Sequence, residues 1–451
     1  MAKKLVSREQ AIQLEPQLQI HPRKSHGVSR SDISENALKV LYRLHKAGYD
    51  AYLVGGGVRD LLLRQQPKDF DIATNATPEQ VKRLFRNSRL VGRRFRLAHI
   101  LFGRDVIEVA TLRGHHVEED SKKAKQNDSG RLLRDNVYGT IDEDAERRDF
   151  TVNGLYYDIS DFSIHDYFGG MDDLEARRLR LIGDPQTRYS EDPVRMLRAV
   201  RFATKLDFTL DASVAKPIPK MAGLLSDIPA ARLFEESLKL FMGGKGVENF
   251  RMMREFNLFA PLFPMQDSLL NKEDGKKVET LIEAVLHNTD QRVNADKPVT
   301  PAFLYAALLW YPLQKMIHKR TSRGTSGYDA MMAACGEVLS QQSKTISMPR
   351  RFTTPAQEIW QMQTRLENRA GARAFRAFEH PRFRAAYDFL LLRGEAEGGE
   401  AAELGRWWTQ FVESDDQGRR QMVRALGGGG ARRRRRPRRR KPSNKASGGS
   451  E

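Results

Sequence analysis

Two aspartates separated by one residue are the first candidates for chemistry. Asp69 and Asp71 follow the segment 51–63, AYLVGGGVRDLLL, in which a short apolar run meets three glycines and then an apolar-periodic stretch. This order predicts a strand, a glycine turn, a helix, a loop and a second strand. Alternate residues of a strand point to one face, so we expect both carboxylates on one side. Adjacent carboxylates repel each other unless a cation lies between them, and Mg²⁺ prefers oxygen ligands.

Three consecutive glycines precede these carboxylates. Gly55, Gly56 and Gly57 lack side chains, so the backbone there can approach a phosphate closely, with amide groups at the helix start as donors. Arg59 follows on the same helix and is expected to reach a nucleotide triphosphate. A tight strand-to-helix turn without a ligand is the alternative interpretation.

A third carboxylate is required if two divalent ions, about 3.5–4 Å apart, are to catalyse phosphoryl or nucleotidyl transfer. Glu108 is an acid within the apolar segment 106–110, which is costly unless it faces a pocket or a cation. Asp149 is the second candidate, and its neighbours Arg147 and Arg148 allow an alternative role as an arginine-paired or helix-capping acid. The choice between Glu108 and Asp149 stays open at this point.

A candidate base-recognition segment begins at Glu191. Asp192 and Pro193 are typical of a helix start, as the N-cap and the first helical residue. Arg195 and the arginines at 198 and 201 then recur every three residues, which predicts a basic stripe along one side. Either this stripe is solvated, or Asp192 and Arg195 hydrogen-bond to the edge of a nucleotide base, as a polymerase without a template requires.

A dense basic run lies between the two carboxylate segments. Lys82 to Arg96 contains seven basic residues and no acid, which is unusual for an ordinary solvated face. Binding to an RNA backbone or to a triphosphate explains it better. We take Arg93, Arg94 and Arg96 as RNA-binding candidates.

The net charge also favours a polyanionic partner. The chain carries a formal charge of +18, and its last segment, 432–451, supplies eight Arg, two Lys and one Glu, or +9, which leaves +9 on the rest. This arginine-rich tail cannot bury a core and is expected to be disordered. It either binds RNA or an anionic partner, or serves only as a solubilising segment.

The cysteine content and the hydropathy exclude several classes of protein. Cys335 is the single cysteine, which excludes an intramolecular disulfide and argues against a cysteine metal site. A reducing, cytoplasmic setting is the simple inference. The first residues lack the apolar core of a signal peptide, and the longest apolar stretch, 303–313, is too short to span a bilayer.

The fold is predicted to be α+β. Strand and helix patterns alternate before about residue 180 and helical patterns dominate afterwards, which predicts a head with a small mixed β-sheet followed by an all-helical neck and body. The expected divisions are a flexible basic arm at 1–31, the head at 32–180, the neck at 181–245, the body at 246–415 and a disordered tail at 416–451.

Several motifs together resemble the class II nucleotidyltransferases, the family of the CCA-adding tRNA enzymes and the bacterial poly(A) polymerases. They are LVGGGVRD at 53–60, DFDIAT at 69–74, RRDFTVN at 147–153 and EDPVRMLRAVRF at 191–202. LVGRRFRLAHI at 90–100 and PAARLFEE at 229–236 are similar to the poly(A) polymerase branch. The similarity runs from about residue 40 to 395, and the arginine-rich tail fits the same branch.

The resemblance assigns roles to individual residues. It implies that Asp69 and Asp71 bind two catalytic Mg²⁺ ions and that Asp149 is a further catalytic carboxylate, with Glu108 as a competing metal ligand. Arg148 and Asp149 are then expected to contact the incoming nucleotide. Its base would be contacted by Asp192 and Arg195.

The implied activity is addition of AMP from ATP to RNA 3′ ends without a template, with release of pyrophosphate, which promotes RNA turnover. The expected substrates are mRNA, small regulatory RNA and decay fragments, held across the helical body, without specificity for DNA. The tail is a candidate contact for RNA-decay proteins, and a monomer is expected. CCA addition to tRNA is the alternative. A non-catalytic RNA-binding protein is a further one, which the intact carboxylates disfavour.

Overall fold

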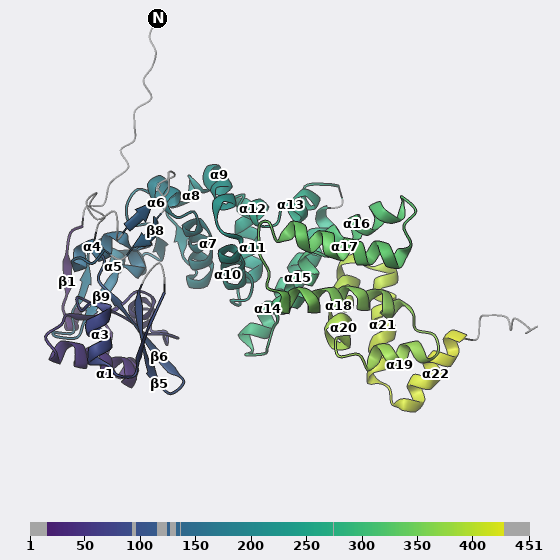
Figure 1. Cartoon of the computed structure of the whole chain (residues 1–451), viewed down its shortest axis with the longest axis horizontal. Helices are drawn as coiled ribbons and strands as arrows, with labels where there is room; N and C mark the ends of the chain where they lie inside the picture. The colour runs from purple at the N-terminus through teal and green to yellow at the C-terminus, as the bar shows by residue number, and fades with distance from the viewer. Residues whose placement is uncertain are drawn as a thin grey trace, which may run out of the picture. The chain divides into compact units, whose positions relative to one another are not determined.

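A computed structural model describes residues 16–92, 96–114, 124–126, 132–135, 137–273 and 275–427 (Figure 1). The chain divides into two compact units, residues 1–354 and 355–451. The first unit contains the head, with its sheet, and the helices that follow it. Among the described helices, none is long and apolar enough to cross a membrane.

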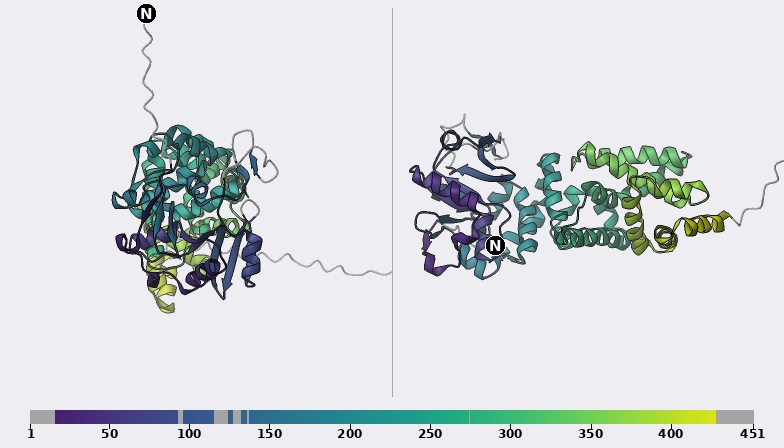
Figure 2. Two further views of the ribbon diagram at one scale, coloured as in Figure 1. Left: turned by 90° about the vertical axis from the view of Figure 1, so that its left-hand side faces the viewer. Right: turned by 90° about the horizontal axis from the view of Figure 1, so that it is seen from below.

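An eight-stranded mixed sheet forms the centre of the head. Its strand order is β1-β10-β9-β2-β3-β6-β5-β4, and all neighbours are antiparallel except β3 and β6, which are parallel. Figure 2 shows these strands, coloured purple to blue, from two further directions. Their bounds are β1 (Gln19–His21), β2 (Ala51–Val54), β3 (Asp71–Thr74), β4 (Ser88–Val91), β5 (Leu97–Phe102), β6 (Asp105–Thr111), β9 (Leu155–Asp158) and β10 (Ile164–Asp166).

The middle strands of the sheet are apolar on both faces, and both faces are buried by the rest of the head. All four residues of β2 are buried, and Ile72 and Ala73 of β3 are buried beside them. Helix α1 (Glu35–Lys46) contributes Val40, Leu41 and Leu44 at helical spacing. The head's remaining helices are α2 (Gly56–Leu62), α3 (Pro78–Leu84), α4 (Ile141–Arg147) and α5 (Gly170–Glu175), and β7 (Ala124–Gln126) pairs with β8 (Leu132–Asp135) apart from the main sheet.

Helices follow the sheet through the rest of the first unit. They are α6 (Pro185–Glu191), α7 (Val194–Leu206), α8 (Ala212–Ala215), α9 (Ile218–Met221), α10 (Ala230–Phe241), α11 (Gly246–Glu255), α12 (Phe259–Leu262), α13 (Pro264–Leu270), α14 (Gly275–Asn294), α15 (Pro301–Leu308), α16 (Trp310–Thr321) and α17 (Gly327–Gln342). The predicted α+β class, a small mixed sheet followed by helices, is confirmed. One detail differs, because β12 (Thr209–Leu210) pairs in parallel with β11 (Arg178–Leu179) and the neck is therefore not entirely helical.

The second unit is a small helical bundle. After α18 (Arg350–Glu367), which runs across the division between the units, it contains α19 (Ala372–Phe378), α20 (Phe383–Glu397), α21 (Gly399–Glu413) and α22 (Asp416–Gly427). Its core is aromatic: Phe383, Trp408 and Phe411 are buried and their rings meet edge to face.

Both ends of the described chain are more structured than the sequence analysis expected. The flexible arm was predicted to extend to residue 31, but β1 pairs with β10, and Val28 is buried. The disordered tail was predicted from residue 416, but α22 forms there because Val423 packs into the core and the Arg419 guanidinium lies over the Phe378 ring. The arginine-rich segment 428–451 lies outside the described residues.

Candidate active site

A pocket of about 850 Å³ opens between the strand ends of the sheet and helices α7 and α10. Ten of the residues singled out from the sequence line it: Gly55, Gly56, Arg59, Asp69, Asp71, Glu108, Arg148, Asp149, Asp192 and Arg195. They come from four segments that are distant in the sequence. The fold therefore gathers the predicted carboxylates, the glycine turn and the predicted base-recognition residues around one cavity.

Three carboxylates share one wall of this pocket. Asp71 is the first residue of β3 and lies directly opposite Glu108 in the parallel pairing with β6, while Asp69 precedes the strand by two residues. Desolvation by the surrounding chain, together with the negative charges of Glu108 and Asp69, raises the pKa of Asp71 to about 6. On the opposite side of Glu108, the Nε2 atom of His99 lies 3.2 Å from its Oε1 atom.

The donor set on this wall fits a hard divalent cation. Carboxylate oxygens are the ligands that Mg²⁺ prefers, and a cation would relieve the repulsion that raises the pKa of Asp71. Within the described ranges, no three His, Cys, Asp or Glu side chains are yet close enough to surround one ion.

Of the three glycines in the turn, one has a backbone conformation that requires glycine, and the other two are less constrained. Gly55 has φ 68° and ψ −132°, a backbone conformation that residues with a Cβ atom rarely adopt, and it directly precedes α2. Gly56 also lines the pocket. Gly57 is buried, and a Cβ atom there would meet the Asp69 carbonyl oxygen at an ordinary 3.5 Å. Gly57, a predicted nucleotide-binding residue, is not part of the lining.

Arg59 is held inside the protein. Its Nε and Nη2 atoms donate to Asp60 Oδ1 at 2.8 and 2.6 Å, and its Nη1 atom donates to Asn153 Oδ1 at 2.5 Å. The side chain is only 3% exposed, although Arg59 touches the pocket. Its present contacts join α2 to the segment that follows α4, and a contact with a triphosphate stays a prediction.

Arg148 is positioned more favourably for an anion. Asp144 Oδ2 accepts from its Nε and Nη2 atoms at 3.2 and 3.0 Å, and the hydroxyl of Tyr156 accepts from Nε at 2.7 Å. Burial opposes the charge, but Tyr156 and Asp144 outweigh it and raise the pKa of Arg148 above its usual range. The remaining Nη1 atom lies 3.4 Å from the point that a Cβ atom on Gly55 would occupy. A permanently charged group therefore borders the glycine turn.

Asp149 forms an ion pair with an arginine of the neck. Arg198 of α7 donates to Asp149 Oδ2 from Nε at 2.8 Å and also from Nη2, while Asn153 and the Phe150 amide donate to Oδ1 at 3.2 and 2.8 Å. Burial would raise the pKa of Asp149, but Arg198 outweighs it and lowers the value to about 2. Which of Glu108 and Asp149 is the third carboxylate at a metal site stays a prediction.

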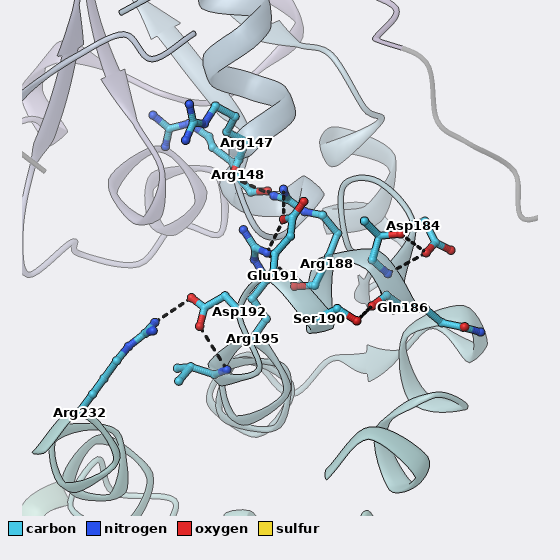
Figure 3. A network of polar contacts seen from close by, with 12 residues as sticks. Arg147, Arg148, Asp184, Gln186, Arg188, Ser190, Glu191, Asp192, Arg195 and Arg232 are labelled. Carbon is cyan, nitrogen blue, oxygen red and sulfur yellow. Dashed lines mark hydrogen bonds and ion pairs between the residues drawn. The ribbon is translucent and has the colours of Figure 1, made fainter. Parts of the chain in front are cut away.

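The side chains of the two base-recognition candidates each contact other residues (Figure 3). Asp192 Oδ2 accepts from Arg232 Nη2 at 2.7 Å, whereas Arg195 Nη1 donates to Glu191 Oε2 at 3.0 Å and to the Arg188 carbonyl at 2.7 Å. Asp192 ends α6 and is not the N-cap of α7, a position that Pro193 occupies. Both predicted residues still line the pocket, each held by a different partner.

Several other polar or aromatic residues of the pocket were not among the predicted site residues. They are Arg113, Asp144, Arg147, Asn153, Arg198, Arg201, Phe202, Arg232 and Lys239. The predicted basic stripe of Arg195, Arg198 and Arg201 lines the pocket. Arg201 lies 4.4 Å from the centre of the Phe202 ring. No sequence pattern other than its place in PAARLFEE pointed to Arg232 as a site residue, because its partner Asp192 is 40 positions away.

The predicted RNA-binding arginines lie mostly beyond what the structure shows. Arg93 and Arg94 are outside the described residues. Arg96 pairs with Glu79 through Nη1 and Oε1 at 2.5 Å, so an acid just outside the basic run compensates part of its charge. Arg96 does not line the pocket, and RNA binding by these three residues stays a prediction.

Family models match three parts of the chain. "Poly A polymerase head domain" matches residues 51–180, "Probable RNA and SrmB- binding site of polymerase A" matches 207–270, and "Polymerase A arginine-rich C-terminus" matches 323–442. The first of these contains the carboxylate wall and the glycine turn. The match to 207–270 includes α10, which carries Arg232 and Lys239 of the pocket.

Solved structures with the same fold include two tRNA-processing enzymes. A CCA-adding enzyme from Bacillus stearothermophilus in complex with CTP is 24% identical with a TM-score of 0.53, covering 86% of this chain and 82% of its own. A tRNA nucleotidyltransferase with a primer tRNA and an incoming ATP analog is 21% identical with a TM-score of 0.57, covering 83% and 98%. At this identity the likeness shows the fold alone.

Curated relatives are much more similar in sequence. Poly(A) polymerase I of Salmonella typhimurium is 53% identical over 93% of this chain and 90% of its own length, and that of Haemophilus influenzae is 49% identical over 88% of each. A CCA-adding enzyme of Lactobacillus helveticus is 37% identical over 50% of this chain and 55% of its own length. Because the agreement with the first two covers head, neck and helical parts alike, this chain belongs to the poly(A) polymerase I family.

Proposed function

We propose that this protein is a polynucleotide adenylyltransferase, which adds AMP from ATP to RNA 3′ ends without a template. The observation that carries the proposal is the pocket in which Asp69, Asp71 and Glu108 line one wall, with Arg148 and the Gly55 turn beside them. Carboxylates supply cation ligands and the arginine supplies fixed positive charge for phosphates. The similarity to the poly(A) polymerases I, over nearly the full length of both chains, favours ATP and RNA as substrates.

The reaction forms one bond and breaks one. The oxygen of the RNA 3′-hydroxyl attacks the α-phosphorus of ATP, the bond from that phosphorus to the bridging oxygen of the β-phosphate breaks, and pyrophosphate leaves. The hydroxyl proton passes to solvent. Two Mg²⁺ ions, held by Asp69, Asp71 and Glu108, would make the hydroxyl a better nucleophile and neutralise charge on the phosphates.

The chain's own residues orient the substrates. Arg148, fixed by Asp144 and Tyr156, offers its Nη1 atom to a phosphate beside Gly55. Asp192 and Arg195 on the neck side are placed to hydrogen-bond to the adenine edge, each oriented by its own partner. In this arrangement Asp149 orients α7 through Arg198 and contributes to the site without binding a metal itself.

The cellular setting belongs to the same proposal. We infer that the RNA substrates are mRNA, small regulatory RNA and decay fragments in the cytoplasm, and that tailing promotes their turnover. The arginine-rich segment after residue 431 is proposed to bind RNA or RNA-decay proteins.

Nucleotide preference tests the proposal directly. The purified chain is incubated with Mg²⁺ and an unstructured RNA, with ATP or CTP offered separately, and in parallel with tRNA lacking its CCA end. Long tails formed from ATP alone support polyadenylation. Growth on tRNA that stops after CCA would replace it with CCA addition, the activity named for the tRNA-processing relatives.

A matched pair of substitutions tests the carboxylates. Asp71→Asn is expected to lower AMP incorporation at least about 100-fold, because it removes a negatively charged ligand of the proposed Mg²⁺ site. Asp207→Asn is the control: Asp207 is 98% exposed and lies outside the pocket, and its positive φ of 56° suits asparagine. Equal rates for Asp71→Asn and the wild type would favour a non-catalytic RNA-binding protein.

A further inference from the structure

Three arginines line a second pocket, which lies entirely within the second unit, and a fourth arginine is close to them in the sequence. Its volume is about 560 Å³, and its lining residues are Thr364, Arg365, Asn368, Arg373, Arg376 and Ala377. Arg365 comes from the end of α18, and Arg373 and Arg376 come from α19. The fourth arginine, Arg369, lies on the connection between the two helices, which are labelled in Figure 1. We call Arg365, Arg369, Arg373 and Arg376 the arginine cluster.

The arginine cluster lacks carboxylate partners in the part of the chain that the structure describes. Elsewhere in the same unit, arginines pair with acids: Arg382 with Glu358 at 2.6 Å and Arg384 with Asp388 at 3.0 Å. Arg365, by contrast, contacts the sulfur of its own helix neighbour Met362 at 4.0 Å. Several uncompensated positive charges around one cavity raise the local potential and attract a polyanion.

The backbone that carries the cluster is rigid. Leu366, Ala374 and Ala377 alternate with the arginines in sequence and are buried in the core of the bundle. The indole Nε1 of Trp408 donates to the Leu366 carbonyl at 2.9 Å, which fixes the end of α18. The packed face therefore holds the arginines on the opposite, exposed face, and little conformational entropy of the backbone is lost when a ligand binds.

An aromatic ring holds one of the guanidinium groups in place. The Arg369 guanidinium lies 5.2 Å from the centre of the Trp407 ring, and Trp407 stacks on Phe411 with an interplanar angle of 21°. A cation held over an indole face keeps its hydrogen-bond donors free at its edges. An arginine beside a partly exposed aromatic ring is the combination by which proteins hold single-stranded nucleic acid.

We propose that the arginine cluster binds the phosphodiester backbone of single-stranded RNA. Guanidinium groups donate paired hydrogen bonds to phosphate oxygens, and the cavity is within the range of about 300–1,000 Å³ that is usual for ligand sites. The inference rests on the proposed function, which makes RNA the substrate. An acidic protein surface is the competing ligand, and it is disfavoured because carboxylates offer no phosphate-like array and no base to lie beside Trp407.

The test measures the affinity of the full chain for a fluorescent oligoadenylate at increasing KCl concentrations. Arg373→Gln with Arg376→Gln is expected to weaken binding about tenfold and to lower the slope of log K against log salt by about 1.4, since two contacts to single-stranded phosphates are lost. Arg384→Gln with Arg420→Gln removes the same charge from outside the pocket. This control is expected to keep the wild-type slope.

Three outcomes would overturn the inference: equal slopes for the two double variants, a lower melting temperature that accounts for the weaker binding, or polyglutamate that competes as well as RNA of equal charge. Substitution to lysine at 373 and 376 is expected to restore the slope but not the full affinity, since lysine keeps the charge without the paired donors.

AMP incorporation at saturating oligoadenylate is measured in parallel. If the wild type extends RNA and the cluster variants bind normally, the inference fails while the proposed function stands; without extension by the wild type, the proposed function itself fails.

Discussion

Arg198 reaches from the neck helix α7 to Asp149 of the head, with its Nε atom 2.8 Å from the Asp149 Oδ2 atom. The two residues are 49 positions apart, and both line the pocket. The pair therefore joins the segment after α4 to the helix that carries Arg195. Asp149 is accordingly more than a candidate ligand, because it also sets where the neck lies relative to the head's sheet within the first unit.

Removal of Arg198 is expected to destabilise the first unit strongly. Arg198→Met leaves Asp149 ionised and largely buried without its counter-charge, which costs about 3–5 kcal/mol of the free energy of unfolding. Urea denaturation at neutral pH measures the loss. Arg384→Met, which breaks an ion pair whose arginine side chain is 73% exposed, is the control and is expected to cost at most about 1 kcal/mol. Similar losses for both variants would show that the Asp149 pair is no more important than a surface pair.

The same ion pair predicts how stability depends on pH. The pKa of Asp149 is lowered to about 2 in the folded state, against about 3.9 when unfolded, so its contribution is complete above about pH 4 and disappears as the pH falls toward 2. The difference in unfolding free energy between the wild type and Arg198→Met is therefore expected to shrink by about 1–2 kcal/mol between about pH 6 and about pH 3. A difference that stays constant over this range would contradict the low pKa.

Short-range patterns predicted the head well, for physical reasons. The strand around Asp71 and the glycine turn depend on local backbone preferences and on hydrophobic periodicity, which the sequence displays directly. The partners of the site residues were not predictable in this way. Arg59 was expected to reach a triphosphate, and no local pattern indicated that its Nη1 atom donates to Asn153, which is 94 positions away. Asp192 and Arg195 were expected to contact a nucleotide base, and no local pattern indicated that Arg232, 40 positions away, contacts Asp192.

Terminal segments were mispredicted for a related reason. The segment that contains β1 is polar and has no internal periodicity, so its order comes from pairing with β10, which no local pattern reveals. The polar helix α22 likewise depends on contacts with the core of the second unit, such as that of Val423. Tertiary packing determines the structure of both segments.

The glycine turn offers a test with an internal control. Gly55→Ala places a side chain at φ 68° and ψ −132°, which is expected to cost about 1–3 kcal/mol in stability and to distort the pocket wall, lowering AMP incorporation. Gly57→Ala adds a methyl group at an ordinary contact distance inside α2 and is expected to leave both properties close to those of the wild type. If Gly57→Ala were the more damaging change, the three glycines would act together at a phosphate, as the sequence first indicated.

Arg232 provides the last test, because it orients Asp192 without being part of the carboxylate wall. Its Nη2 atom lies 2.7 Å from Asp192 Oδ2, and loss of a charged hydrogen bond of this kind is expected to raise the KM for ATP about tenfold in Arg232→Gln. The kcat value is expected to change much less, since the proposed position of the reacting phosphate is beside Asp71. Arg177→Gln, at a side chain that is 68% exposed and 3.9 Å from its acidic partner, is the control. Partial recovery of the KM in Arg232→Lys would support positioning through charge, whereas a fall in kcat at unchanged KM would place Arg232 at the reacting centre instead.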